Sequence, residues 1–258
     1  MKKVVLIGAG NVSTSLAFAF ANAGWNIVQV YSRLLRNAEV LSCKYNAIPI
    51  NSLADIDECA DLYIIAVSDN SISKIADNLR NVDGIVVHSS GSTPLSVLAN
   101  VKSKGIGVFY PFQTFSKSQL VDLKGVPIFV EASSVDVLSF LFDVGREIGF
   151  SVNELTSEKR MLLHLSGVFA NNFTNHILAL TYRLTSENGI DFKILQPLVE
   201  ETVRKAFAAN PKDVQTGPAV RGDLNTIEMH SCLLKNFDEQ LHKIYNELSL
   251  SIQKLSKQ

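Results

Sequence analysis

Hydrophobic and polar positions follow an alternating arrangement over the first 155 residues. Short runs of consecutive apolar and β-branched residues alternate with helix-length segments in which apolar residues recur every three or four positions. Consecutive apolar runs are typical of parallel strands that are buried on both faces. We predict seven or eight strands, the clearest at 4–7, 26–31, 62–67, 85–88, 106–109 and 127–131, with a weaker one at 151–155.

The helices between these strands have recognisable starts. Ser134 is a suitable N-cap for one helix, and Thr93 followed by Pro94 predicts the start of another. Strands that alternate with helices in this way predict an α/β fold, here a Rossmann-type, doubly wound and mostly parallel sheet.

After residue 155 the pattern becomes helical throughout. Residues 157–188 contain no proline and carry apolar side chains at helical spacing, and further helices are expected after Pro197, at 226–234 and at 238–255, with a loop at 210–223. We therefore predict two domains, residues 1–155 and an all-α domain of residues 156–258. The apolar face of the long helix is wider than so small a helical domain can cover, which predicts a homodimer.

Composition and charge exclude several classes of partner. The 24 Lys and Arg residues nearly balance the 25 Asp and Glu residues, so we expect binding neither to nucleic acid nor to a membrane surface. The first apolar run ends after four residues, too short for a secretory signal. Three scattered cysteines fit neither a disulfide framework nor a metal site, and we expect a cytoplasmic protein without a metal.

A glycine-rich turn joins the first strand to the first helix. Its sequence is Gly8-Ala9-Gly10-Asn11-Val12-Ser13. The first glycine permits a tight turn, the second lets the backbone approach a pyrophosphate, and the helix N-terminus offers N–H groups to that anion. Ser13 replaces the usual third glycine. This turn predicts a dinucleotide site, with an ordinary strand-to-helix turn as the alternative.

The end of the second strand indicates which dinucleotide binds. An NAD site usually has an acidic residue here, whereas this chain has Ser32-Arg33. A guanidinium forms charge-assisted bonds to a 2′-phosphate, which favours NADP. Arg36 is an alternative for this role, and a solvated surface arginine is the structural alternative.

Two further strand ends are expected to line the same cofactor site, because ligands bind at the carboxyl ends of parallel strands. They are Val67-Ser68-Asp69 and Ser89-Ser90-Gly91. The serines of the second segment could equally be turn and cap residues. His88, directly before it, is a weaker acid/base candidate.

Several motifs together resemble a known group of proteins. They are Gly8 to Ser13, Ala60-Asp61, residues 86–92, Tyr110-Pro111-Phe112-Gln113, His164 with Asn172-Phe173, and residues 216–223 with His230. The chain resembles the group that includes pyrroline-carboxylate reductase, deazaflavin-dependent NADP reductases and the 6-phosphogluconate and hydroxyacid dehydrogenases. Within it, the chain is most similar to bacterial NADP oxidoreductases of uncharacterised substrate with a distinctive helical C-terminal domain.

The resemblance implies a nucleotide-binding N-terminal domain, a helical dimer-forming domain like that of 6-phosphogluconate dehydrogenase, and a substrate cleft between the two. The dehydrogenases of this group use a lysine on the first long C-terminal helix. Residues 160–183 contain no lysine, so that mechanism does not carry over to this chain.

Polar residues on the long helix are candidates for the reaction. His164, Asn171 and Asn175 share one stripe, and Asn172 and His176 share an adjoining one. Hydrogen-bonded core or dimer contacts explain the five equally well. The family motif favours His164 as a proton donor, since an imidazole titrates near neutrality, and Asn172 as a group that orients a carbonyl or the nicotinamide amide.

The loop at 216–223 contains the remaining candidates. Arg221 is suited to hold a substrate carboxylate or phosphate, and Asp223 to fix that guanidinium. The structural alternative is that Asp223 caps the next helix and Arg221 forms a surface ion pair. His230 is a weaker acid/base candidate.

These features favour an NADP(H)-dependent oxidoreductase that transfers a hydride to or from a small C=O or C=N substrate in the interdomain cleft. The alternatives are an NADP(H)-binding sensor or regulatory protein without turnover, and a purely structural dimerisation protein.

Overall fold

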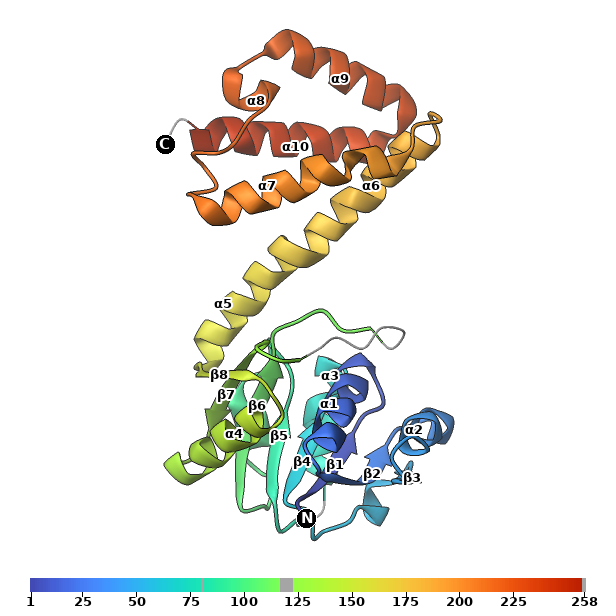
Figure 1. The fold of residues 1–258 in the computed structure, drawn as a ribbon, viewed down its shortest axis with the longest axis vertical. Helices are drawn as coiled ribbons and strands as arrows, with labels where there is room; N and C mark the ends of the chain where they lie inside the picture. Colours follow the sequence, from blue (N-terminus) through green and yellow to red (C-terminus); the bar gives the residue numbers. More distant parts are fainter. Residues whose placement is uncertain (80, 117–122, 257–258) are drawn as a thin grey trace. The chain divides into compact units, whose positions relative to one another are not determined.

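The computed structural model describes residues 1–79, 81–116 and 123–256. The chain forms two compact units, Met1–Asn171 and Asn172–Gln258 (Figure 1). The first unit contains all the strands of the described residues and the second contains only helices. The change from strands to helices falls between Glu154 and Ser157, and the first helix after it belongs to the first unit.

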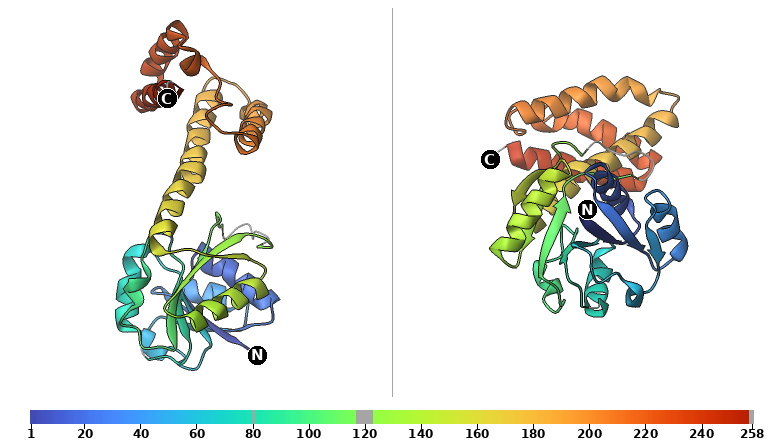
Figure 2. Two further views of the ribbon diagram at one scale, coloured as in Figure 1. Left: turned by 90° about the vertical axis from the view of Figure 1, so that its left-hand side faces the viewer. Right: turned by 60° about the horizontal axis from the view of Figure 1, so that its bottom comes forward.

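The first unit is built on an eight-stranded sheet with the order β3-β2-β1-β4-β5-β6-β7-β8 (Figure 1), and Figure 2 shows the ribbon from two further directions. Neighbouring strands are parallel except β6 and β7, which are antiparallel. The strands are β1 (Lys3–Ile7), β2 (Asn26–Tyr31), β3 (Ile48–Ile50), β4 (Leu62–Ile65), β5 (Ile85–His88), β6 (Gly105–Pro111), β7 (Pro127–Ala132) and β8 (Ser151–Glu154). The direction of strand order reverses at β1, so a crevice is expected between the ends of β1 and β4.

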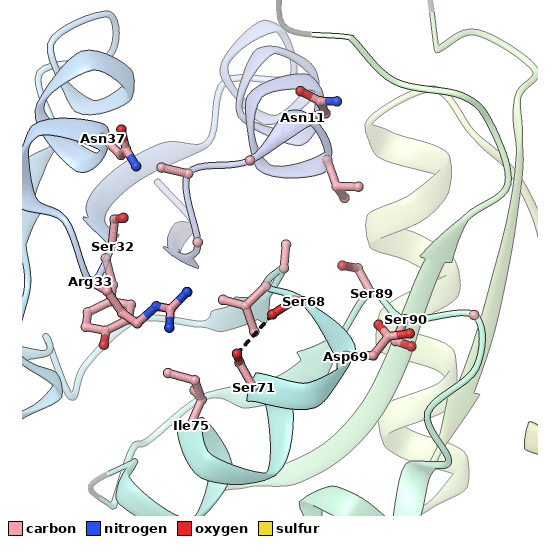
Figure 3. Close-up of a pocket in the computed structure, with 18 of the residues that line it drawn as sticks. Asn11, Ser32, Arg33, Asn37, Ser68, Asp69, Ser71, Ile75, Ser89 and Ser90 are labelled. Carbon is pink, nitrogen blue, oxygen red and sulfur yellow. Dashed lines mark hydrogen bonds between the residues drawn. The ribbon is translucent and has the colours of Figure 1, made fainter.

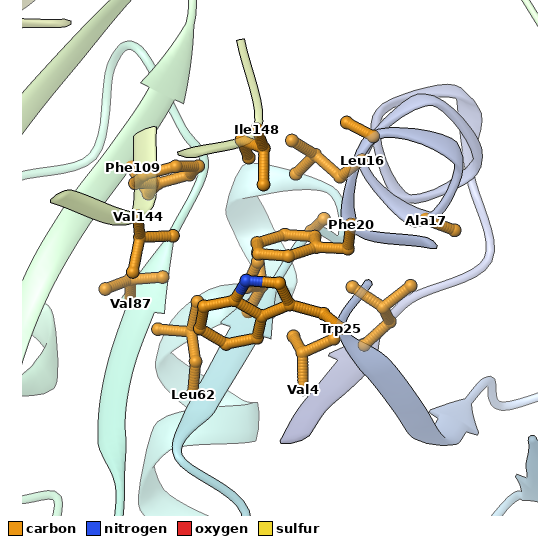
Figure 4. Close-up of a cluster of buried hydrophobic side chains, with 14 of the residues drawn as sticks. Val4, Leu16, Ala17, Phe20, Trp25, Leu62, Val87, Phe109, Val144 and Ile148 are labelled. Atoms are coloured by element: carbon orange, nitrogen blue, oxygen red, sulfur yellow. The ribbon is translucent and has the colours of Figure 1, made fainter. Parts of the chain in front are cut away.

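Helices cover both faces of this sheet because both faces of its strands are apolar. On one face, Val4 and Leu6 pack with α1, α2 and α4, while Val5 and Ile7 pack with α3 on the other. These helices are α1 (Asn11–Asn22), α2 (Leu35–Ser42), α3 (Asp69–Asn78) and α4 (Val135–Glu147). Phe20 and Trp25 are buried in the first core, in edge-to-face contact at 5.1 Å between ring centroids (Figure 4).

The predicted Rossmann-type sheet is confirmed, and each strand predicted from the sequence is present. Strand β3 was not predicted, because three residues around a proline are too short to give a pattern. Ser134 caps α4 as expected, accepting a hydrogen bond from Val137 N at 3.3 Å. The helix expected at Thr93 was wrong: only a short 3₁₀ turn, η2 (Leu95–Leu98), follows, because the Thr93 hydroxyl bonds to Ser90 and does not cap a helix.

Helices follow one another in the rest of the chain. Residues 157–188 were expected to be helical, and residues 157–186 form α5, a π-helical segment and α6 without interruption. The expected loop at 210–223 contains a short helix, α8. The elements are α5 (Ser157–Gly167), η3 (Val168–Phe173), α6 (Thr174–Ser186), η4 (Phe192–Leu195), α7 (Gln196–Ala208), α8 (Pro218–Arg221), α9 (Leu224–Phe237) and α10 (Glu239–Ser256). No helix in the described ranges is both long and apolar enough to cross a membrane.

Candidate functional site

A cavity of about 570 Å³ opens in the first unit at the carboxyl ends of the parallel strands (Figure 3). It brings together every cofactor-site residue predicted from the sequence except Ser13, and it includes His164. Its lining residues are Gly8, Ala9, Gly10, Asn11, Val12, Tyr31, Ser32, Arg33, Asn37, Ala66, Val67, Ser68, Asp69, Ser71, Ile75, Ser89, Ser90, Gly91, Tyr110 and His164.

The glycine turn borders this cavity with backbone groups. Gly8 has φ of 128°, and a Cβ placed on it would lie 2.2 Å from the Ala66 carbonyl oxygen. Gly10 precedes α1 without any side-chain cap, and among the described residues a Cβ on Gly10 would meet nothing within 4 Å. The first turn of α1 contains no acidic residue. Uncapped N–H groups and the positive end of the helix dipole therefore suit a pyrophosphate here.

Two residues of the turn have structural contacts. Ser13 is fully buried and its hydroxyl lies 3.3 Å from the position of a Gly8 Cβ, so it packs beneath the turn and does not line the cavity. Asn11 donates a hydrogen bond to the Phe115 carbonyl at 2.9 Å. Asn11 thereby joins the turn to the segment that follows β6.

Ser32, Arg33 and Asn37 lie at one end of the cavity, across from Asp69, Ser89 and Ser90 (Figure 3). A neighbouring cavity of about 480 Å³ shares Arg33 and adds the cation Lys74 on α3. In the described part of the chain neither cation forms an ion pair. Two unpaired cations beside a serine suit a phosphate.

Lys74 was missed by sequence reasoning, because only the sheet order brings α3 next to the end of β2. Arg36, the alternative to Arg33, lines neither cavity.

Tyr110 and His164 form a hydrogen-bonded pair beside Gly91, at the end of the cavity opposite Arg33. Tyr110 Oη lies 3.0 Å from His164 Nδ1. His164 Nε2 has no hydrogen-bond partner among the residues described. Gly91 lies against both rings: a Cβ there would be 2.6 Å from His164 Nδ1 and 2.7 Å from Tyr110 Cζ. Tyr110 and His164 can therefore form their hydrogen bond against the backbone of residue 91 only because that residue is a glycine, which has no Cβ.

The electrostatic surroundings keep the Tyr110 hydroxyl protonated. Burial, together with the negative charge of Asp69, raises the pKa of Tyr110 to about 12, although the Arg160 cation opposes this rise. A neutral phenol can donate to Nδ1 of a neutral imidazole, and the ring proton then resides on Nε2. Tyr110 belongs to a motif that carried the family resemblance, but the sequence did not single it out as a site residue.

The polar side chains near Gly91 are partly used in local structure. Ser90 Oγ accepts hydrogen bonds from the backbone N–H groups of Ser92 and Thr93, at 3.2 and 3.0 Å. The Ser90 hydroxyl thus acts as a turn residue, as the structural alternative proposed. Asp69 Oδ2 accepts a bond from Ser92 Oγ at 2.5 Å.

His88 is fully buried and does not line the cavity. Burial, followed by the Arg160 charge, lowers the pKa of His88 to about 4. Its Nδ1 accepts a hydrogen bond from Ser90 N at 3.2 Å. His88 is therefore neutral at pH 7, its Nδ1 already accepts a hydrogen bond, and its side chain lies outside the cavity. It is unsuited to donate a proton to a ligand in the cavity, so His88 is a structural residue.

The other predicted residues belong to the second unit and are described within it. Asn172 is exposed in the π-helical segment, a type of distortion that is frequent at functional sites. Arg221 is exposed at the end of α8. Asp223 caps α9: it accepts bonds from Thr226 Oγ1 and N at 2.7 and 3.1 Å, and these bonds lower the pKa of Asp223. His230 Nδ1 lies 3.0 Å from Tyr245 Oη.

The sheet order, the glycine turn at its switch point and the cavity beside that turn define a dinucleotide-binding domain of the Rossmann class. Residues 1–109 match the Rossmann-like domain family, and residues 126–252 match a domain of unknown function, DUF2520. None of the curated proteins searched matches the chain.

Among solved structures, the chain is similar to putative NADP oxidoreductase BF3122 from Bacteroides fragilis, with 39% identity over 98% of both chains and a TM-score of 0.90. The chain belongs to the family of that protein, which confirms the resemblance found in the sequence. Protein TM1727 from Thermotoga maritima matches over 98% of both chains, with 19% identity and a TM-score of 0.70. An imine reductase from Myxococcus stipitatus in complex with NADP+ is 13% identical over 99% of this chain and 93% of its own, with a TM-score of 0.64. The last two matches show a shared fold.

Proposed function

We propose that this protein is an NADP(H)-dependent oxidoreductase that transfers a hydride between the nicotinamide and a C=N or C=O bond of a small substrate. The continuous lining of one cavity, from the glycine turn to His164, carries this assignment. Membership in the family of the putative NADP oxidoreductase BF3122 from Bacteroides fragilis supports it.

In this proposal the residues that would hold NADP(H) line the cavity. Gly8 to Val12 would hold the pyrophosphate through backbone N–H groups, and Arg33 with Lys74 would hold the 2′-phosphate. Ser89 to Gly91 would line the nicotinamide site. NADPH, when bound, would supply the hydride.

The chain supplies the proton. His164 Nε2 donates to the substrate nitrogen or oxygen as the hydride arrives at carbon, and Tyr110 returns a proton to the imidazole through Nδ1. Solvent then restores the proton on His164 Nε2, and the Nδ1 proton returns to the Tyr110 oxygen. We assign Arg221 to an anionic group of the substrate and Asn172 to its carbonyl or to the nicotinamide amide, as the sequence predicted.

Calorimetric titration with NADPH and NADH tests the cofactor assignment. Arg33→Ser is expected to weaken NADPH binding by about 10- to 150-fold, because charge-assisted hydrogen bonds contribute about 1.5–3 kcal/mol. NADH binding should change little, since NADH has no 2′-phosphate. Arg36→Ser removes an arginine that is also exposed but lies outside both cavities, and it is the matched control. No binding of either dinucleotide to the wild type would refute the assignment.

We also propose that the helical unit forms a homodimer. Ala219 is the one apolar side chain buried among the described residues of this unit. Large apolar side chains are exposed instead: Leu198 by 66%, Phe207 by 88% and Leu233 by 64%. A helical unit needs its apolar faces covered to be stable, and a second copy offers the same faces. Sedimentation equilibrium should give twice the chain mass of 28.3 kDa, and a monomer would contradict the dimer.

A further inference from the structure

Arg160 is a buried cation in the first turn of α5. Its side chain is 1% exposed, and no other charged residue is buried among those that the structure describes. Its guanidinium pairs with the Glu131 carboxylate on β7 and donates to the Thr93 carbonyl oxygen at 2.6 Å. Burying a guanidinium is costly even when it is paired, and apolar residues often hold a helix as well. The charge and its directed bonds therefore suggest a role besides stability.

The face of α5 that carries Arg160 also carries His164. Ser157, Arg160 and His164 are spaced by three and four residues, so they share one face of α5. Ser157 adds to the contacts between α5 and the sheet unit: its hydroxyl donates to Glu131 Oε2 at 2.7 Å and accepts from Leu95 N at 3.0 Å. His164 follows Arg160 by one helical turn.

The sheet likewise presents Glu131 and Tyr110 on one face. In the antiparallel pair of β6 and β7, Val108 lies opposite Glu131 and Tyr110 lies opposite Phe129. Opposite residues share a face, as do residues two apart in one strand. Two contacts, Arg160 with Glu131 and His164 with Tyr110, therefore join the same face of α5 to the same face of the sheet.

The loop beneath the pair is fixed by the same guanidinium. Arg160 holds the carbonyl of Thr93, two residues after Gly91, and Gly91 lies directly against both rings. A small rotation of α5 would press His164 onto the Gly91 backbone or move it beyond hydrogen-bond distance of Tyr110. The arrangement leaves little freedom for His164 once Arg160 is bound.

We propose that Arg160 is a positioning residue for the proton-donating pair, His164 and Tyr110. Through Glu131 it sets the rotation of α5, and through Thr93 it sets the position of the loop at Gly91. Together these contacts place His164 Nδ1 within hydrogen-bond distance of the Tyr110 hydroxyl. The role of this pair in reduction rests on the proposed function, whereas the positioning itself does not. Among the described residues, the charged or titratable groups that act on the Tyr110 hydroxyl are Asp69 from α3, and Arg160 and His164 from α5.

The test is a double variant, Glu131→Leu with Arg160→Met, which removes the ion pair without leaving an unpaired buried charge. NMR of ¹⁵N-labelled histidine rings reports the tautomer of His164, assigned by comparison with His164→Gln. The wild type should show one neutral tautomer with the proton on Nε2. The folded double variant should shift toward the mixture of tautomers of a free imidazole, and kcat should fall about 10- to 100-fold with the KM for NADPH unchanged.

Arg146→Met makes the same chemical change at an exposed arginine of α4 and should leave the His164 signals as in the wild type. Arg160→Lys keeps the charge but loses the forked geometry, and should shift the His164 signals in the same direction as the double variant. If the double variant does not fold, the His164 signals of the Arg160→Lys variant test the proposal. Wild-type His164 signals in a folded variant would overturn the proposal. Calorimetry with NADPH on the wild type separately reports any failure of the cofactor assignment.

Discussion

Replacement of His164 by glutamine is expected to lower the rate of NADPH oxidation about 10²- to 10⁴-fold, the usual contribution of a positioned general acid. Glutamine keeps a polar group next to Tyr110 but cannot pass a proton between two ring nitrogens. His164 lies against Gly91, and Figure 3 shows the neighbouring Ser90 across the cavity from Arg33, so NADPH affinity should stay close to that of the wild type. The measurements are kcat over a panel of small imines and ketoacids, and calorimetric titration with NADPH.

Two further variants make this experiment specific. Tyr110→Phe removes only the hydroxyl that bonds to Nδ1, and it should lower kcat in the same direction as His164→Gln. His176→Gln changes an exposed histidine of α6 and should have no effect. Unchanged turnover in His164→Gln would exclude His164 as the donor. Tight NADPH binding by a wild type that reduces nothing in the panel would instead favour a sensor.

Gly8→Ala is expected to destabilise the protein even without cofactor. The new Cβ would lie 2.2 Å from the Ala66 carbonyl oxygen at a φ of 128°, so the ends of β1 and β4 must separate. Strain and the backbone clash together should cost about 3 kcal/mol or more. The melting temperature of the cofactor-free protein should fall by roughly 10 °C.

Gly10→Ala provides the matched comparison within the same turn. A Cβ at Gly10 meets no atom within 4 Å in the part of the chain that the structure describes, so the cofactor-free melting temperature should be nearly unchanged. The methyl group would occupy space that the pyrophosphate needs, so NADPH affinity should fall at least tenfold, or about 1.4 kcal/mol. Equal melting temperatures for Gly8→Ala and the wild type would contradict the packing derived for this turn.

Much of the nucleotide-binding unit could be predicted because its signals are local. The apolar runs of β1, β2 and β4 and the glycine turn follow directly from neighbouring residues in the chain. Local signals failed where contacts from distant segments decide the structure. Thr93 could have capped a helix, but its hydroxyl bonds to Ser90 and its carbonyl to Arg160.

The candidate cofactor site could likewise be predicted only where it depends on local signals in the sequence. The residues at strand ends, including Ser32 and Arg33, were found because parallel strands end at one edge of a sheet. Lys74 and Tyr110 were not, because their approach to the cavity depends on strand order and on which face of β6 is used. Asp223 illustrates an ambiguity that only coordinates resolve: its carboxylate caps α9.

The sequence by itself determined the class of fold and the glycine turn, and it predicted a site for a 2′-phosphate, since each depends on residues that are adjacent along the chain. Only the tertiary structure decided that His164 pairs with Tyr110 over Gly91 and that Arg160 is buried against Glu131. These contacts join segments separated by tens of residues. Their distances are set by how α5 packs on the sheet, and no periodicity in the sequence records that packing.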